Sequence, residues 1–325
     1  MATPTIAMIP SSFKAGELGS VLPLNGDGDF DFTRAGGKTR INKAQQIENV
    51  LTGVPSIDYT GGGCPSLLLE PQQTQLYGET ATMETQTKTV TAVEHTVGFY
   101  GTGTITFTGV YSGSLVGTGT NDRVELTFTP TAGSLISTVS GSVTSSQLVT
   151  GAYLGSYIPN TTTGTTTRIA DAASKTGLSS YINSTEGVLY AEIASLFNTV
   201  GSSYISLSDG TYNNRISILY SVGTNIIRAF LRVGGVSQAD LNFTATDITQ
   251  FKKVAFKYKE NDFSLWIDGI EVATDLTGST IPNGTLNAIS FSEIGTVGGA
   301  FYGKIKALEV YTALTDAELT TLTTV

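Results

Sequence analysis

Cysteine, histidine and tryptophan are nearly absent from this sequence of 325 residues, because each occurs only once, as Cys64, His95 and Trp266. A single cysteine excludes an intrachain disulfide, so stability does not rest on an oxidising compartment. One histidine and one cysteine also exclude a zinc site built from these ligands. Cys64 follows three glycines and precedes Pro65, and we expect it to be a small packed residue rather than a reactive thiol.

Charge and long apolar runs are also scarce. Charged residues make up 14% of the chain, the formal net charge is −9 and the pI is about 4.7. The lack of a basic cluster argues against nucleic-acid binding, while a neutral or cationic partner and a plain acidic exterior both fit the charge. No apolar run reaches the roughly 18 residues that a membrane helix needs. The first residues lack the basic and apolar regions of a signal peptide, so we expect synthesis in a cytoplasm without Sec-type export.

The abundant residues favour β-structure. The chain has 37 glycines, 40% hydrophobic residues, and many Ser and Thr, which indicates an all-β protein. In the stretch 251–273, Val254, Phe256 and Tyr258 alternate with small or charged residues, as in a half-buried strand. Asp268-Gly269 suits a two-residue hairpin turn. A meander of this kind needs a second sheet over its apolar face.

The chain divides by pattern into four parts. Residues 1–80 have few periodic apolar positions and suit an N-terminal attachment or oligomerisation arm. Residues 81–160 alternate apolar residues with Thr or Ser between glycines, which predicts a small β-sandwich with 151–159 as its last strand. Residues 161–175 read as a low-complexity linker. Residues 176–325 contain many short strand patterns, and their number predicts a two-sheet jelly roll.

Three motifs in the last part point to a known superfamily. They are Phe263–Gly269 (FSLWIDG), Gly303–Tyr311 (GKIKALEVY) and Ala313–Leu319 (ALTDAEL). Thr315 and Glu318 of the third motif form a capping-box pattern, which predicts a terminal helix. This part resembles the concanavalin A-like lectin/glucanase superfamily in its laminin-G-like form. The resemblance implies a concanavalin A-like jelly roll and a lectin-like role.

A second resemblance rests on motifs outside that part. Phe32–Ala35 (FTRA), Cys64–Gln72 (CPSLLLEPQ) and Thr167–Asp171 (TRIAD) are similar to motifs of phage virion structural proteins of the tail-fibre and head-fibre kinds. Gln73 and Gln75 depart from the Arg and Asn of that group. In such proteins the motifs frame a sandwich that is similar to a carbohydrate-binding module.

The second resemblance implies a non-catalytic bacteriophage virion structural protein, a fibre, spike or decoration protein that adheres to host-surface glycans. Residues 1–80 would bind other virion proteins, and fibres of this kind are homotrimers. The protein would be made in the host cytoplasm and reside in the virion. Two alternatives stay open: a purely architectural virion protein without ligand, and a glycan-degrading enzyme of the same fold.

The residues needed for catalysis are poorly represented. Retaining glycoside hydrolysis needs two carboxylates about 5–5.5 Å apart. The nearest candidates are Asp268 with Glu271, which bracket a hairpin turn, and Asp316 with Glu318, which lie in the expected helix. His95 is in mid-strand beside no nucleophile motif, so Ser-His-Asp chemistry is not expected either. We therefore predict that the protein is not an enzyme.

A glycan site is predicted from aromatic and planar polar residues near one loop, since sugar faces pack on rings while hydroxyls seek amides and guanidinium groups. The candidates are Tyr204, Tyr212, Asn213, Asn214, Arg215 and Trp266. Trp266 points opposite Leu265 on its strand, and either a ligand surface or a second packing layer fits that orientation.

Two loops contain the Asp and Asn residues that calcium sites use. The loop 208–214 suits Ca²⁺ or a sugar, with an ordinary hairpin loop as the alternative. The stretch 25–31 resembles a calcium loop but lacks the Gly and Glu that an EF-hand register requires. We expect no obligatory cofactor.

Overall fold

The computed structural model describes residues 2–10, 20–21, 30–294 and 299–325, and it divides the chain into two compact units. Unit 1 comprises Met1–Thr33, Cys64–Leu69 and Ala172–Val325, and unit 2 comprises Arg34–Gly63 and Glu70–Asp171. Residues 1–80 are thus divided between the two units. The chain passes from one unit to the other four times.

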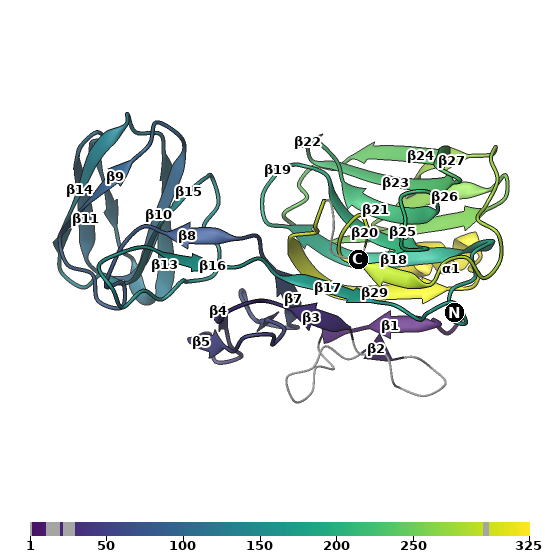
Figure 1. The fold of residues 1–325 in the computed structure, drawn as a ribbon, viewed down its shortest axis with the longest axis horizontal. Helices are drawn as coiled ribbons and strands as arrows, with labels where there is room; N and C mark the ends of the chain where they lie inside the picture. The colour runs from purple at the N-terminus through teal and green to yellow at the C-terminus, as the bar shows by residue number, and fades with distance from the viewer. Residues whose placement is uncertain (1, 11–19, 22–29, 295–298) are drawn as a thin grey trace. The chain divides into compact units, whose positions relative to one another are not determined.

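Two antiparallel sheets make up most of unit 1 (Figure 1). The first has the strand order β2-β1-β29-β18-β25-β26-β27, with β7 also paired to β29, and the second has the order β24-β23-β21-β20-β28-β17-β3. The strands of the first sheet are β1 (Ile6–Met8), β2 (Ser20–Val21), β7 (Ser66–Leu69), β18 (Glu186–Ser195), β25 (Lys252–Lys259), β26 (Phe263–Ile267), β27 (Ile270–Asp275) and β29 (Gly303–Tyr311). Those of the second are β3 (Asp31–Thr33), β17 (Ala172–Lys175), β20 (Ser203–Ser208), β21 (Arg215–Tyr220), β23 (Ile226–Val233), β24 (Val236–Thr244) and β28 (Ala288–Ser290), and a short pair is formed by β19 (Thr199–Val200) and β22 (Gly223–Thr224).

The meander expected over residues 251–273 is confirmed as strands β25, β26 and β27. Phe256 pairs with Leu265 across β25 and β26, and both side chains are fully buried. Asp268 and Gly269 both have positive φ, 49° and 87°, as a tight hairpin with matching strand twist requires. The two-sheet architecture expected for this part is therefore present.

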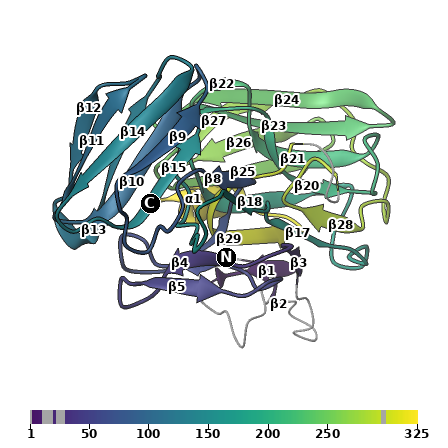
Figure 2. The same cartoon turned by 60° about the vertical axis from the view of Figure 1, so that its left-hand side comes forward.

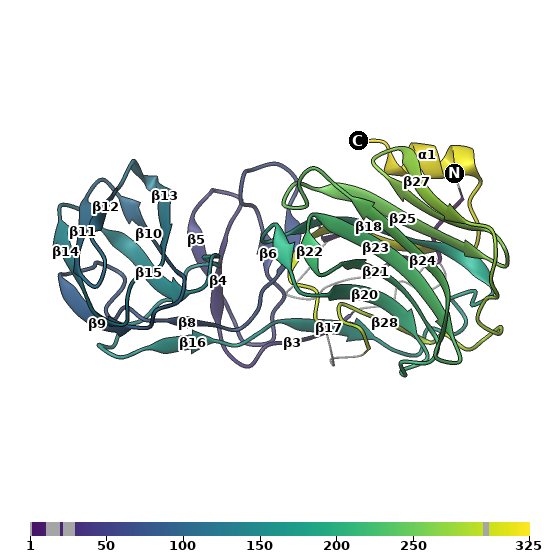
Figure 3. The same cartoon turned by 90° about the horizontal axis from the view of Figure 1, so that it is seen from above.

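The terminal helix α1 (Asp316–Thr323) packs on β25, β26 and β27 of the first sheet (Figure 3). Thr315 caps the helix as expected. Its hydroxyl accepts a hydrogen bond from the backbone amide of Glu318, and the Glu318 carboxylate accepts one from the backbone amide of Thr315. Beneath α1 lies an apolar cluster that includes Trp266, Tyr190 and Leu319. Among the described residues, no helix is long and apolar enough to cross a membrane.

Unit 2 contains a small β-sandwich (Figure 2). One sheet has the order β13-β10-β15 and the other β12-β11-β14-β9. Its strands are β9 (Gln86–Val90), β10 (His95–Gly101), β11 (Thr104–Gly109), β12 (Gly113–Val116), β13 (Gly119–Phe128), β14 (Gly133–Ser140) and β15 (Thr144–Thr150), and the remaining strands of unit 2 are β4 (Lys38–Ile41), β5 (Ile47–Val50), β6 (Ile57–Asp58), β8 (Gln73–Gln75) and β16 (Thr166–Arg168). The core includes Phe99, Phe107 and Leu148, which are at most 1% exposed.

The expectation of a last strand over residues 151–159 was wrong, because this segment is irregular and the sandwich ends with β15. Buried side chains accept the hydrogen bonds that a neighbouring strand would otherwise accept from this segment. The amide of Gly155 donates to Gln73 Oε1 (3.1 Å), that of Ser156 to Glu70 Oε1 (2.7 Å), and that of Ile158 to Gln147 Oε1 (3.0 Å). The backbone donors are thus satisfied without strand pairing.

A buried network of five charged side chains lies in unit 2. Lys38 Nζ is 2.9 Å from Glu70 Oε2 and 2.8 Å from Asp171 Oδ2. Arg34 pairs with Asp171 at 3.0 Å, and Arg168 pairs with Glu70 at 3.0 Å. Each of these side chains is at most 1% exposed. We call this set the ion network.

Several polar contacts of Glu70 affect the ionisation of its carboxyl. Burial alone would raise the pKa of its carboxyl, but Arg168 and Lys38, together with the hydroxyl of Ser156, hold that pKa well below its usual range. The Tyr153 hydroxyl also donates to Glu70 at 3.2 Å. Charged groups buried this completely need such pairing, since an isolated buried ion costs far more than a paired one.

The expectation for Cys64 was wrong, because the structure places this residue at the surface. Gly61, Gly62 and Gly63 all have positive φ (85°, 75° and 76°), a conformation that glycine adopts readily. They form an exposed turn that carries Cys64 outward, and burial begins only at Pro65.

Candidate functional site

The strongest candidate site is one face of the second sheet of unit 1, on β20, β21 and β23. Strand register places Arg215 opposite Arg232, Ser217 opposite Phe230, and Leu219 opposite Arg228. Figure 3 shows these strands side by side in one layer. On the other face of the same strands lie the fully buried Ile216 and Ile218. The alternation of a β-strand therefore separates the apolar core from a face that carries arginine.

Phe230 is the centre of this face. The guanidinium carbons of Arg215, Arg228 and Arg232 lie 5.0, 5.4 and 5.9 Å from its ring centroid. Tyr204 meets the same ring edge-on, with centroids 6.1 Å apart. These distances suit cation–π and edge-to-face contacts. We call the five residues the Phe230 face.

Two of the three arginines have carboxylate partners. Arg215 Nη2 donates to Glu293 Oε1 at 2.7 Å, and Arg228 binds both oxygens of Asp240, with Nε to Oδ1 at 2.6 Å. Burial lowers the pKa of Arg215, and the neighbouring charge of Arg232 lowers this pKa further. The carboxylate of Glu293 partly offsets the decrease. The hydrogen bond to Asp240 raises the pKa of Arg228.

The loop 209–214 forms a rim beside this face. Asp209 accepts hydrogen bonds from the Thr211 amide (2.8 Å) and from Asn214 Nδ2 (2.8 Å). Asn214 Oδ1 in turn accepts from the Gly234 amide at 2.9 Å, which ties the loop to the turn between β23 and β24. Tyr212 is 45% exposed, its ring centroid is 5.4 Å from the Arg215 guanidinium, and its carbonyl accepts a bond from Arg215 Nη1.

Five of the six residues predicted from the sequence meet here. Tyr204 and Arg215 belong to the Phe230 face, and Tyr212, Asn213 and Asn214 belong to the rim. Trp266 is on the first sheet, 6% exposed and in the cluster beneath α1, with its indole Nε1 donating to Ser264 Oγ at 2.9 Å. A binding role for Trp266 stays a prediction.

Sequence reasoning missed Arg228, Phe230, Arg232 and Glu293. The first three follow one another at every second position in the strand Ile226–Val233, so the period of two places them on one face. That signal was available in the sequence. Glu293 follows strand β28, and only the folded chain brings it to Arg215.

The histidine and the carboxylates that catalysis would need lie in structural positions. The ring of His95 is 1% exposed, with Nδ1 2.7 Å from the Val93 carbonyl oxygen and the ring stacked on Phe128. Asp268 pairs with Lys252 at 2.9 Å in its hairpin. Asp316 and Glu318 lie in the first turn of α1.

The structure describes one of the two loops with calcium-like sequences completely. In the loop 208–214, the Asp209 carboxylate takes hydrogen bonds from within the loop. Most of the stretch 25–31 lies outside the described residues. Across the described ranges, no group of three or more His, Cys, Asp or Glu side chains is arranged to hold a metal ion.

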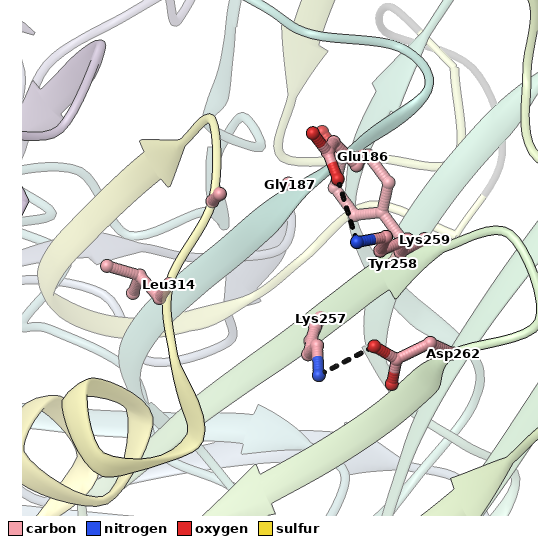
Figure 4. Close-up of a pocket in the computed structure, with 8 residues that line it drawn as sticks. Glu186, Gly187, Lys257, Tyr258, Lys259, Asp262 and Leu314 are labelled. Carbon is pink, nitrogen blue, oxygen red and sulfur yellow. Dashed lines mark ion pairs between the residues drawn. The ribbon is translucent and has the colours of Figure 1, made fainter.

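A separate hollow of about 150 Å³ lies in unit 1, between the start of β18, the end of β25 and the segment before α1 (Figure 4). Its charged side chains form ion pairs, Lys257 with Asp262 at 2.9 Å and Lys259 with Glu186 at 3.6 Å. Among the described residues that line it, Tyr258 is the only aromatic one, and it is fully buried. It therefore offers a ligand neither an exposed ring nor an unpaired charge among its described lining residues.

No family model matches the chain, and no curated protein matches it in sequence. Solved structures do resemble it. The CBM40 of the Ruminococcus gnavus IT-sialidase is 21% identical, with a TM-score of 0.38 over 44% of this chain and 84% of that chain. Domain 4 of AbnA, a GH43 arabinanase from Geobacillus stearothermophilus solved with arabinotriose, is 15% identical, with a TM-score of 0.39 over 49% and 77%. A SAP-like pentraxin from Limulus polyphemus is 14% identical, with a TM-score of 0.34 over 44% and 71%. Likenesses this distant assign no ligand to this protein.

Proposed function

We propose that this protein is a non-catalytic, lectin-like protein that binds a glycan at the Phe230 face and its rim. The observation that carries the proposal is the exposed ring of Tyr212 beside the exposed amide of Asn213. Sugar C–H faces pack against aromatic rings, and amides exchange hydrogen bonds with sugar hydroxyls. The ring and the amide lie on a loop that hydrogen bonds attach to the sheet, which lowers the ordering cost of binding.

Binding without catalysis is supported by the state of the carboxylates. Glu293 and Asp240, which adjoin the Phe230 face, are each held by an arginine. Glycoside hydrolysis needs one carboxyl group as acid and another as base or nucleophile across the scissile bond. Because each of these two carboxylates is already in an ion pair with an arginine, neither is available as the acid, base or nucleophile.

The protein's setting is proposed to be the surface of a phage virion, where it adheres to host glycans as a homotrimer. Support comes from the similarity of the FTRA, CPSLLLEPQ and TRIAD motifs to virion structural proteins. Repeated copies on one particle would convert weak sites into avid binding. Immunogold labelling of the phage particles is the test, and protein found only in the soluble lysate would contradict this location.

Glycan binding is best tested with the full chain on beads, against an array of bacterial surface glycans. A fragment that begins near residue 170 would lack β1 and β7, which both pair with β29. We expect selective binding that is lost in Tyr212→Ala and Asn213→Ala. The matched control is Leu276→Ala, which removes another exposed large side chain of unit 1 (69% exposed).

Two outcomes would contradict the proposal. Binding to no glycan on the array would favour the alternative of an architectural virion protein without ligand. Binding that survives both rim substitutions would place the site elsewhere. The oligomeric state is tested by light scattering, since three chains of 34.0 kDa give 3 × 34.0, about 102 kDa, and a mass near that of one chain would contradict the trimer.

A further inference from the structure

The arginine pair Arg215 and Arg232 is electrostatically unfavourable as it stands. The two residues are direct partners across β21 and β23, on the same face of the sheet. Like charges directly opposite each other in a sheet destabilise it. Arg232 also acts to lower the pKa of Arg215, as a neighbouring cation does.

The counter-charges around Phe230 are fewer than the cations. Glu293 pairs with Arg215, and Asp240 pairs with Arg228. Within the described ranges of the chain, Arg232 forms neither an ion pair nor a side-chain hydrogen bond, although it is only partly exposed. Three guanidinium groups thus share two carboxylates.

This concentration of positive charge is local. The chain as a whole has a net charge of −9, and yet every arginine of unit 1 lies on this one face. A non-specific attraction for anions is therefore not expected from the whole molecule. An anion would instead be attracted where the cations gather.

We propose that the glycan bound here carries a carboxylate, and that Arg232 is the residue that binds it. This inference rests on the glycan-binding function proposed above. A guanidinium group forms two parallel hydrogen bonds with a carboxylate, a geometry that a lysine ammonium cannot reproduce. The Phe230 ring holds the Arg232 guanidinium 5.9 Å from its centroid. The rim next to Arg215 supplies the ring and amides for the rest of the sugar.

The test uses the full chain and pairs of polymers that differ only at the carboxylate. Polygalacturonate, alginate, hyaluronan and polysialic acid are each immobilised beside their carboxyl-reduced counterparts, with dextran sulfate as a sulfated probe. We expect binding to at least one acidic member and a loss of about tenfold or more on its reduced partner, as for a charge-assisted hydrogen bond. Added salt should weaken the acidic interaction.

Two variants probe the role of Arg232 itself. Arg232→Gln should lose about tenfold or more in affinity for the acidic polymer, and Arg232→Lys should recover only part of it. Arg40→Gln in unit 2 is the control, because it removes an arginine from a partly exposed ion pair. Without ligand, Arg232→Gln should change the unfolding temperature of unit 1 only slightly, because it removes the unfavourable contact with Arg215 together with the contact to the Phe230 ring.

The outcomes separate this inference from the proposed function. One outcome is equal binding to the acidic polymers and to their reduced partners, with binding lost in Tyr212→Ala but kept in Arg232→Gln. This outcome would contradict recognition of a carboxylate by Arg232 and leave the proposed glycan binding intact. Equal capture of dextran sulfate would overturn selectivity for a carboxylate. A clear destabilisation by Arg232→Gln in the absence of ligand would make Arg232 a structural residue. Binding to no polymer and no array glycan would overturn both proposals.

Discussion

Lys38 and Asp171 are 133 residues apart in the sequence, and yet Lys38 Nζ lies 2.8 Å from Asp171 Oδ2 with both side chains fully buried. Three of the four passages of the chain between its units occur next to members of the same ion network: Thr33 to Arg34, Leu69 to Glu70, and Asp171 to Ala172. The network thus holds these three chain segments together within unit 2. It also gives a physical role to the charged residues of the FTRA, CPSLLLEPQ and TRIAD motifs.

Removing one member of the network should be strongly destabilising. We expect Glu70→Gln to lower the free energy of unfolding of unit 2 by about 3–5 kcal/mol, because Lys38 and Arg168 stay buried without their counter-charge. Hydrogen exchange of peptides from unit 2 is the suitable measurement, since the only tryptophan lies in unit 1.

The control for that variant is Glu48→Gln. Glu48 pairs with Arg40 at 3.1 Å but is 44% exposed, so its loss should cost at most about 1 kcal/mol. Equal effects of the two variants would contradict a special contribution from the buried network.

Acid should remove the contribution of Glu70. Its pKa in the folded protein is held below the usual value, so the unfolded state binds the proton more readily. The stabilisation is complete above the unfolded pKa of about 4.3 and declines as the pH falls toward the lower folded value. The unfolding temperatures of the wild type and of Glu70→Gln should differ by a constant amount from pH 7 to pH 5. This difference should become smaller below about pH 4.3. A difference that stays constant down to pH 3 would show that Glu70 does not carry it.

The capping box of α1 should be measurable through Trp266, which packs beneath the helix. Thr315→Ala removes the acceptor of the hydrogen bond from the Glu318 amide and should lower the free energy of unfolding by about 1 kcal/mol. The measurement is tryptophan fluorescence during urea unfolding. Thr321→Ala is the control, because its exposed hydroxyl bonds only within the helix. If both variants unfold at the same urea concentration, the cap is not stabilising.

Cys64 should react in the native protein. Because the thiol is exposed, one equivalent of Ellman's reagent should be consumed without denaturant, and none by Cys64→Ser. Reaction only after addition of guanidinium chloride would indicate that Cys64 is covered.

Short-range patterns predicted several strands and the terminal helix. The alternation over 251–273 and the capping box at Thr315 each depend on neighbours within a few residues, and the structure confirms both. Tyr212, Asn213 and Asn214 lie together on one loop because they are consecutive, and their role in glycan binding stays a prediction. The prediction of a strand over 151–159 was wrong because amides of this segment donate to the side chains of Glu70, Gln73 and Gln147 instead of to a neighbouring strand.

The sequence by itself determined that this protein is built of antiparallel strands, because a period of two and glycine-rich turns act locally. Only the tertiary structure decided which charges meet. Arg215 faces Arg232 through strand pairing, Glu293 reaches Arg215 from 78 residues away, and Lys38 reaches Asp171 from 133. Trp266 was likewise placed by the packing of α1 on its sheet. Such contacts depend on how distant segments pack, and no pattern of neighbouring residues encodes them.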